Sequence, residues 1–232
     1  MKLQENRTLV ILPAYNEENS IVETIKNLKK SAPEVDYVII NDCSTDNTLK
    51  VCKENNFNVI DLPINLGIGG AVQTGYKYAY ENNYDIAIQM DSDGQHDPKY
   101  INNMIEKIIN GNKIVIASRF ISNEGFQSTF IRRMGINLYS FIIKIFTGAK
   151  IKDTTSGYRA INRELIELFS KAYPVDYPEP ETNAYIAKKH YKFEEIPVEM
   201  KERAGGKSSI TPFKSVYYAI KVGLAVMLAC IF

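Results

Sequence analysis

The sequence predicts an α/β fold with a mostly parallel central sheet flanked by helices. Short β-rich apolar runs alternate with segments of helical periodicity through the first half of the chain. This alternation is typical of parallel sheets in which each strand is followed by a helix. The length of 232 residues and the 45% share of hydrophobic residues are sufficient to bury a substantial core.

Five strands are predicted, and helical patterns fill the intervals between them. The strands cover residues 8–12, 37–41, 58–62, 85–90 and 113–118. The first helix is predicted to start with a capping box formed by Ser20 and Glu23, and the second follows a run of capping residues at 43–47. Polar loops follow the carboxyl ends of the strands, which is where open α/β sheets bind ligands.

The distribution of charge predicts a localised anionic partner. The formal net charge of +1 argues against a generally basic nucleic-acid-binding protein. Residues 125–152 and 203–232 nevertheless contain several basic residues and no acidic one, so the rest of the chain is net acidic. We therefore expect two basic segments on an acidic body and no nucleic-acid partner.

The cysteines and the N-terminal residues indicate a cytoplasmic setting. Cys43, Cys52 and Cys230 are odd in number and lack metal-ligand spacing, so reduced thiols are expected in place of a disulfide framework. The apolar run Leu9–Leu12 is too short for the core of a secretory signal, and we expect it to be the first strand.

Asp91 and Asp93 follow the apolar run of the fourth predicted strand. In an extended segment residues i and i+2 point the same way, so both carboxylates, with Gln95, would present oxygens toward one point. Two carboxylates that close repel unless a cation lies between them, and hard oxygen ligands suit Mg²⁺ or Mn²⁺. The alternative is a solvated Asp-Gly turn with a capping aspartate, and this pair alone leaves both possibilities open.

Three further strand-end loops carry polar or glycine-rich sequence. PAYNEE at 13–18 and NDCSTD at 41–46 should converge at one edge of the sheet, although turn formation and helix capping also account for the second. In NLGIGGAVQTG, at 65–75, Val72 stands where a dinucleotide fingerprint requires glycine. We therefore expect close helix packing and backbone approach to a ligand there, with a dinucleotide-binding dehydrogenase as the alternative.

The order of motifs resembles glycosyltransferase family 2, whose members are inverting enzymes with the GT-A fold. The motifs are PAYNEE, NDCSTDNT, NLGIGGA, MDSDGQH, ASRF, DTTSGYRA, YPEPE and RAGGKSS, and they cover nearly the whole chain. The sequence is most similar to the branch of dolichyl-phosphate mannose synthase and bacterial polyprenyl-phosphate glycosyltransferases. That resemblance implies transfer of a sugar from a nucleotide diphosphate sugar, a UDP-sugar in preference to a GDP-sugar, to a polyprenyl phosphate for cell-envelope glycan assembly.

The resemblance also implies roles for individual residues. The residues implied to hold the nucleoside are Pro13, Ala14, Tyr15, Glu17 and Asp42. Those implied to hold a divalent metal on the diphosphate are Asp91, Asp93 and Gln95. Those implied to contact phosphate groups are Arg119, Arg203 and Lys207. Arg133 and Arg119 are expected nearest the acceptor phosphate, with Arg132 as a helper. Glu179 and Glu181 are expected to contact sugar hydroxyls or to position the acceptor, unless YPEPE is only an acidic turn.

Two departures and two open alternatives limit what the resemblance implies. Asn41 stands where many relatives have an aspartate, and the chain has no tryptophan, so the Q-x-x-R-W motif of processive synthases is missing and one sugar should be added. An acceptor phosphate is already ionised at neutral pH and needs no strong base, in agreement with a chain whose two histidines, His96 and His190, form no nucleophile-base arrangement. His96 is expected to be a loop residue, with a neighbour of the metal as the alternative. The alternatives are transfer to a glycan or protein hydroxyl, with Glu181 as the first suspect for the base, and a non-catalytic membrane-bound partner protein.

Two segments predict contact with a membrane. Phe130, Met134, Leu138, Phe141 and Ile145 recur at helical spacing opposite a polar stripe, which indicates an amphipathic helix at about 126–146. A second helix is expected to start at 211–212 and to become apolar toward its end. We therefore expect a catalytic domain at 1–210 and a membrane-associating helix at 211–232.

We expect these helices to hold the protein on the cytoplasmic face of the cell membrane, against anionic lipid, as a peripheral or monotopic protein. A small membrane protein partner or a homo-oligomer is also compatible with the sequence. The alternative for the first helix is packing on the sheet.

Overall fold

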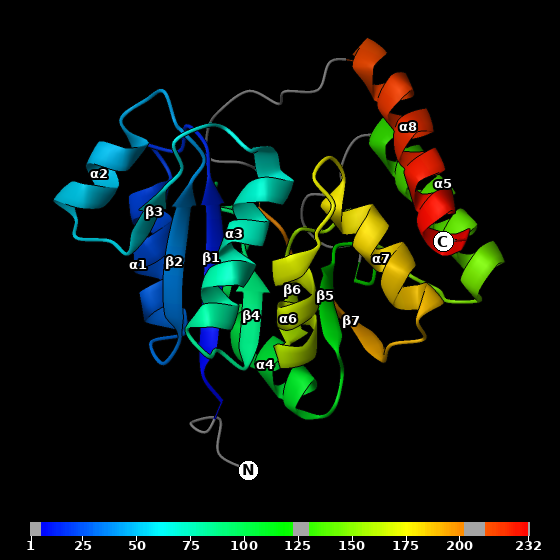
Figure 1. The fold of residues 1–232 in the computed structure, drawn as a ribbon, viewed down its shortest axis with the longest axis horizontal. Coiled ribbons are helices and arrows are strands. Elements are labelled where there is room, and N and C mark those ends of the chain that lie inside the picture. The colour runs from blue at the N-terminus through cyan, green and yellow to red at the C-terminus, as the bar shows by residue number, and fades with distance from the viewer. Residues whose placement is uncertain (1–5, 123–129, 202–211, 232) are drawn as a thin grey trace.

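A computed structural model describes residues 6–122, 130–201 and 212–231 of the chain. Its centre is a seven-stranded sheet with the strand order β3-β2-β1-β4-β6-β5-β7, whose strands follow one another from left to right in Figure 1. The strands are β1 (Thr8–Ala14), β2 (Asp36–Asn41), β3 (Val59–Asp61), β4 (Ile86–Gln89), β5 (Ile114–Ser118), β6 (Arg159–Asn162) and β7 (Phe193–Pro197). The prediction of an α/β fold with a mostly parallel sheet is confirmed.

The five predicted strands are all present, and the sheet contains two more. β6 was not predicted, and it pairs antiparallel with both β4 and β5. β7 then pairs parallel with β5 at the edge. Because β6 runs in the opposite direction, its first residue, Arg159, lies opposite Gln89 at the carboxyl end of β4. The residues that precede β6 therefore reach the same edge of the sheet as the loop that follows β4.

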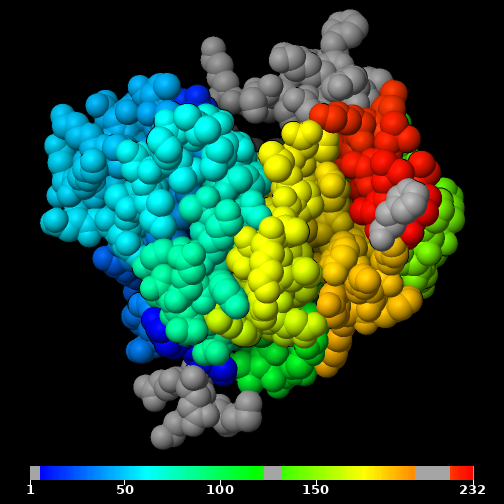
Figure 2. Space-filling model, viewed as in Figure 1, coloured from blue at the N-terminus to red at the C-terminus, as the bar shows by residue number. Residues whose placement is uncertain are grey.

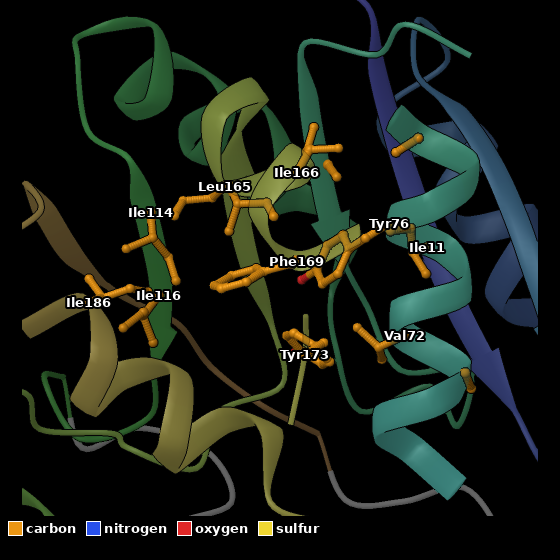
Figure 3. Packing of buried hydrophobic residues seen from close by; sticks show 14 of the residues in the cluster. Ile11, Val72, Tyr76, Ile114, Ile116, Leu165, Ile166, Phe169, Tyr173 and Ile186 are labelled. Carbon is orange, nitrogen blue, oxygen red and sulfur yellow. The ribbon is translucent and has the colours of Figure 1, made fainter. Parts of the chain in front are cut away.

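Helices cover both faces of the sheet. They are α1 (Ile21–Ser31), α2 (Thr48–Glu54), α3 (Gly67–Glu81), α4 (Ile101–Ile109), α5 (Phe130–Thr147), α6 (Arg163–Lys171), α7 (Pro178–Lys188) and α8 (Pro212–Ile231). Alternate residues of β1 point to opposite faces, so Val10 and Leu12 pack with α1 and α4, while Leu9 and Ile11 pack with α3 and α6. Figure 3 shows the cluster on the α3 and α6 face. At its centre are Tyr76, Phe169 and Tyr173, whose ring centroids are 5.2–5.8 Å apart.

The glycines of α3 serve close packing. A Cβ at Gly75 would lie 2.2 Å from Cγ2 of Ile11, and a Cβ at Gly69 would lie 2.3 Å from the carbonyl oxygen of Val175. The expected helix packing is therefore present at both positions. The capping box predicted at the start of α1 is wrong: the Ser20 hydroxyl makes no capping bond and donates to the Glu17 carboxylate at 2.6 Å.

α5 and α8 lie side by side and form one end of the molecule together with α7, as Figure 1 shows. Ile136, Tyr139 and Ile143 of α5 and Val222 and Val226 of α8 are buried in the cluster that also contains Leu9 and Ile11. α8 therefore contributes to the hydrophobic core. Among the described residues no helix is long and apolar enough to cross a bilayer.

Candidate active site

One edge of the sheet gathers most of the predicted site residues that the structure describes. Parallel strands β1, β2, β4 and β5 end there, and antiparallel β6 begins there. The loops that meet at this edge contain the residues after β1 (15–17), Asp42, the segment 91–96, Arg119 and the residues before β6 (154–157). Contact between these loops follows from sheet topology, because the strands place their ends at one level.

The first part of the edge holds the residues expected at the nucleoside. The backbone N–H of Asp42 donates to the carbonyl of Ala14 at 2.8 Å, and the Asp42 carboxylate accepts from the N–H of Leu66 at 2.7 Å. This carboxylate thus joins the end of β2 to the loop before α3. Pro13, Ala14, Glu17 and Asp42 are buried, whereas Tyr15 is 48% exposed and accessible to a ligand.

Asn16 joins two of these loops. Its backbone has φ 59°, and its side-chain oxygen accepts from the N–H of Thr45 at 2.8 Å. The Asn16 N–H donates to the hydroxyl of Ser44 at 2.9 Å. The two loops are therefore in direct contact. Asp46 accepts from the N–H of Thr48, the first residue of α2, at 2.9 Å, while Asn47, the N-cap residue, makes no side-chain capping bond.

The segment 91–96 is a turn and not a continuation of β4. The expectation that Asp91, Asp93 and Gln95 point the same way from an extended strand is wrong, because Gly94 has φ 82° and the Asp93 carboxylate accepts from the N–H of Gln95 at 3.0 Å. Asp91 and Gln95 line a small cavity of about 50 Å³, whereas Asp93 is 7% exposed and does not line it.

His96 lies in this loop, as expected, and is a buried neighbour of Asp91. Its Nδ1 accepts from the N–H of Asp91 at 3.0 Å, and its Nε2 lies 3.6 Å from the Asp91 carboxylate. The ring stacks on Tyr158 at a centroid distance of 4.8 Å. Burial lowers the pKa of His96 to about 4, against the raising effect of Asp93, so the ring is neutral at neutral pH.

Arg119 enters the same cavity from the end of β5. Its guanidinium makes two hydrogen bonds to Asp153, at 2.7 and 2.8 Å, and a third to the hydroxyl of Thr155 at 3.1 Å. Asp153 is completely buried and was not predicted, because it lies 34 residues away in the sequence. Arg119, expected to contact phosphate, therefore lines the cavity with its charge paired to a protein carboxylate.

Of the two arginines at the start of α5, Arg132 lines the cavity. Arg133, which we expected nearest the acceptor phosphate, instead stacks on Phe120, with its guanidinium carbon 3.7 Å from the ring centroid. Desolvation and the charge of Arg119 lower the pKa of Arg132, although the residue is exposed as a whole and stays charged. Arg132, and not Arg133, thus lines the cavity in the structure.

The two glutamates of YPEPE are on different sides of a helix. The motif forms the first turn of α7, with Pro178 at its start, and is not an isolated turn. Glu179 accepts from the side-chain amide of Gln89 at 3.2 Å, next to the cavity. Glu181 lies near Asp176 and Lys221, and its pKa is raised by burial and by Asp176. The structure thus brings Glu179, and not Glu181, toward the cavity.

The predicted phosphate contacts Arg203 and Lys207 lie outside the described residues. The described chain reaches the site at Met200, which lines the cavity, and at Lys201, whose N–H donates to the carbonyl of Gln95 at 3.1 Å. The segment after β7 therefore comes to the same edge of the sheet as the loops described above.

The composition of the cavity fits a hard divalent cation. The Asp91 carboxylate and the Gln95 side chain line the cavity together with the guanidinium groups of Arg119 and Arg132. Asp153 is paired with Arg119, and the carboxylates of Asp93 and Glu179 lie next to the cavity. Among the described residues no group of three or more His, Cys, Asp or Glu side chains could hold a metal. The oxygens of Asp91 and Gln95 are of the kind that Mg²⁺ accepts, and Mg²⁺ commonly takes one or two carboxylates and completes its coordination with water and substrate phosphates.

Comparison of the sequence with known proteins identifies one family and several similar proteins. Residues 9–169 match the family described as glycosyl transferase family 2. UDP-N-acetylglucosamine–dolichyl-phosphate N-acetylglucosaminyltransferase of Methanococcus voltae is 33% identical over 210 residues, which are 82% of this chain and 83% of that protein. Undecaprenyl-phosphate mannosyltransferase of Micrococcus luteus is 26% identical over 216 residues, or 88% of each chain.

Among solved structures, glucosyl-3-phosphoglycerate synthase of Mycobacterium tuberculosis, in complex with Mn²⁺, UDP-glucose and phosphoglyceric acid, matches with a TM-score of 0.76. The match covers 97% of this chain and 80% of that chain at 16% sequence identity. At this identity the similarity establishes the fold alone, and that fold is GT-A.

Proposed function

Since the chain belongs to glycosyl transferase family 2, we propose that this glycosyltransferase transfers one sugar from a nucleotide diphosphate sugar to a polyprenyl phosphate, with inversion and with a divalent metal. The relatives whose names specify an acceptor act on dolichyl or undecaprenyl phosphate and match over most of both chains. The product would be a polyprenyl-phosphate sugar that supplies cell-envelope glycan assembly.

The observation that carries this proposal is the juxtaposition of Asp91, Arg119 and Arg132 in one small cavity. A transferase of this kind must hold a diphosphate with its metal beside a second phosphate. Carboxylates favour the metal and guanidinium groups favour phosphate oxygens, so both kinds of group are needed within a few ångströms of each other. A dinucleotide-binding dehydrogenase would need a different set, Val72 interrupts the glycine fingerprint that suggested one, and residues 9–169 match glycosyl transferase family 2.

In the proposed reaction an oxygen of the acceptor phosphate attacks the anomeric carbon from the face opposite the diphosphate. The bond from that carbon to the diphosphate oxygen breaks, and the nucleotide diphosphate leaves with the electron pair. The acceptor phosphate, with its second pKa near ~6, is mostly dianionic at neutral pH, so no general base is required. Inversion at the anomeric carbon follows from a single displacement.

Asp91, with Asp93 and Gln95 on the same turn, would hold the metal ion on the diphosphate. A bound Mg²⁺ or Mn²⁺ supplies Lewis-acid stabilisation of the charge on the leaving diphosphate. His96 holds the Asp91 backbone N–H and packs beside its carboxylate, which fixes the turn. Arg119, held by Asp153, and Arg132 would orient the acceptor phosphate and stabilise its charge.

A lipid-phosphate acceptor requires access to a membrane surface, and the exposed faces of α5 and α8 fit that requirement. Apolar side chains that are 45–62% exposed lie along both helices: Met134, Leu138, Phe141, Ile145, Ile220, Leu224, Leu228 and Ile231. The two helices are adjacent at one end of the molecule, where Figure 2 shows α8 in red beside α5 in green. We call this set the exposed apolar stripe. With Lys144 exposed beside it, the stripe supports a peripheral position on an anionic bilayer, which we assign to the cytoplasmic face.

The test is transfer of radiolabelled sugar from UDP-glucose, UDP-N-acetylglucosamine and GDP-mannose to a short-chain polyprenyl phosphate, read in the organic phase. We expect organic-phase label with at least one donor, its loss in EDTA and its recovery when Mg²⁺ or Mn²⁺ is added back. Asp93→Asn should remove most turnover and leave the circular dichroism spectrum unchanged. Full transfer in chelator would refute the metal, and label that appears only with a free alcohol or glycan acceptor would refute the phosphate.

A further inference from the structure

Glu179 lies next to the cavity but is not part of its lining. One oxygen of its carboxylate accepts from the side-chain amide of Gln89 at 3.2 Å, and the described residues provide no other hydrogen bond to this carboxylate. The side chain is half-buried, so its second oxygen can accept from a ligand. Because successive residues of an α-helix are about 100° apart, Glu181 points roughly 200° away from Glu179.

Rigid elements fix the position of Glu179. Gln89 is completely buried on β4, two residues before Asp91. On the other side, Arg159, also completely buried, donates to the hydroxyl of Thr182 at 2.7 Å and to the carbonyl of Ser156 at 2.7 Å. The first turns of α7 are thereby joined to the sheet and to the loop that lines the cavity. A carboxylate held in this way can discriminate between ligands, because it cannot follow a misplaced partner.

Gly157 separates this carboxylate from Asp91. A Cβ at position 157 would lie 3.1 Å from the amide nitrogen of Gln89 and 3.4 Å from the Asp91 carboxylate. Glycine at this position therefore keeps a side chain out of the space between the Asp91 carboxylate and the Gln89–Glu179 pair. A group attached to the diphosphate could extend over Gly157 and reach Glu179.

We propose that Glu179 is the residue that recognises the transferred sugar, and this inference rests on the proposed function. A carboxylate only accepts hydrogen bonds, and sugar hydroxyls supply donors, so the free oxygen of Glu179 would bind one hydroxyl or an adjacent pair. The attacking acceptor phosphate needs no base from the protein, which leaves Glu179 available for recognition. It determines specificity because an epimer with the hydroxyl turned away leaves the carboxylate desolvated and unpaired.

The experiment compares Glu179→Gln with Glu181→Gln and with Glu167→Gln, an exposed α6 glutamate that serves as the matched control. Calorimetry in Mg²⁺ measures the Kd of UDP, UDP-glucose, UDP-galactose and UDP-N-acetylglucosamine, and transfer assays measure kcat and KM for whichever donor the wild type uses. We expect Glu179→Gln to weaken the preferred nucleotide sugar at least tenfold and to reduce the ratio between epimers, with the Kd of UDP unchanged within about twofold. A donor that is a GDP-sugar would be tested with GDP and GDP-mannose in the same way.

Two outcomes would overturn the inference. One is a Glu179→Gln protein that distinguishes the epimers as the wild type does; the other is an equal loss of affinity for UDP, which would indicate a disturbed fold or diphosphate site. An effect confined to Glu181→Gln would also overturn it. Binding is measured without an acceptor. A wild type that binds nucleotide sugars but transfers nothing to polyprenyl phosphate would therefore refute the proposed function, while the binding data would still decide whether Glu179 recognises the sugar.

Discussion

At the scale of residues, the buried pair of Arg119 and Asp153 makes a prediction about stability. Asp153→Asn would leave the Arg119 charge buried without its ionic partner, so we expect the free energy of unfolding to fall by about 3–5 kcal/mol. The control is Glu164→Gln, which removes a partner of Lys113 from an exposed pair and should cost less than about 1 kcal/mol. Urea denaturation measures both, and similar losses in the two variants would contradict the structural assignment.

The arginines of α5 give a second prediction at this scale. Arg132 lines the cavity and Arg133 stacks on Phe120, so Arg132→Ala should lower kcat/KM for the polyprenyl phosphate by about 30-fold or more, equivalent to about 2 kcal/mol. Arg133→Ala should change it by no more than about threefold. Acceptor-dependent kinetics at saturating donor provide the measurement. A larger loss in Arg133→Ala would restore the order that the sequence suggested.

At the scale of elements, two helical glycines should respond in opposite ways to the same substitution. Gly75→Ala places a Cβ 2.2 Å from Ile11 between α3 and β1, and we expect this overpacking to cost about 1–3 kcal/mol. In Gly223→Ala of α8 the nearest atom, Cδ1 of Ile142, is 3.8 Å away, so the gain in helix propensity should stabilise the protein by up to about 1 kcal/mol. Calorimetric Tm values that move in the same direction would show that one contact is misplaced.

At the scale of the whole molecule, the exposed apolar stripe makes a prediction about vesicle binding. Leu138→Glu combined with Leu224→Glu places two charges in the stripe without touching the core, because both side chains are about half exposed. We expect co-sedimentation with anionic vesicles to fall at least several-fold while Tm changes little. The control is Lys50→Glu, which also adds an acidic residue but lies on α2, at the far end of the molecule in Figure 1.

Binding that persists in the double variant and is lost in Lys50→Glu would place the membrane contact elsewhere. Deletion of α8 is the weaker test, because Val222, Val226 and Cys230 are buried in the core and their loss would unfold their neighbours.

The sequence by itself determined the strands and the edge of the sheet at which the site forms. The apolar runs of β1, β2, β4 and β5 are buried over most of their length. A buried strand of this kind can be recognised from a few consecutive apolar residues. The same local information identified Asp91 as a site residue and α5 as a helix with apolar faces. It did not identify β6, which has only four residues and pairs with both β4 and β5.

Only the tertiary structure decided which side chains share the cavity. Asp153 meets Arg119 because β6 inserts antiparallel between β4 and β5, and no pattern in the sequence specifies a partner 34 residues away. Glu179 and Glu181 are equivalent in an extended turn, but the helix that begins at Pro178 turns them to different sides. Local sequence sets backbone preference within a few residues, whereas the direction of each side chain at the site depends on strand order and helix phase, which long-range packing fixes.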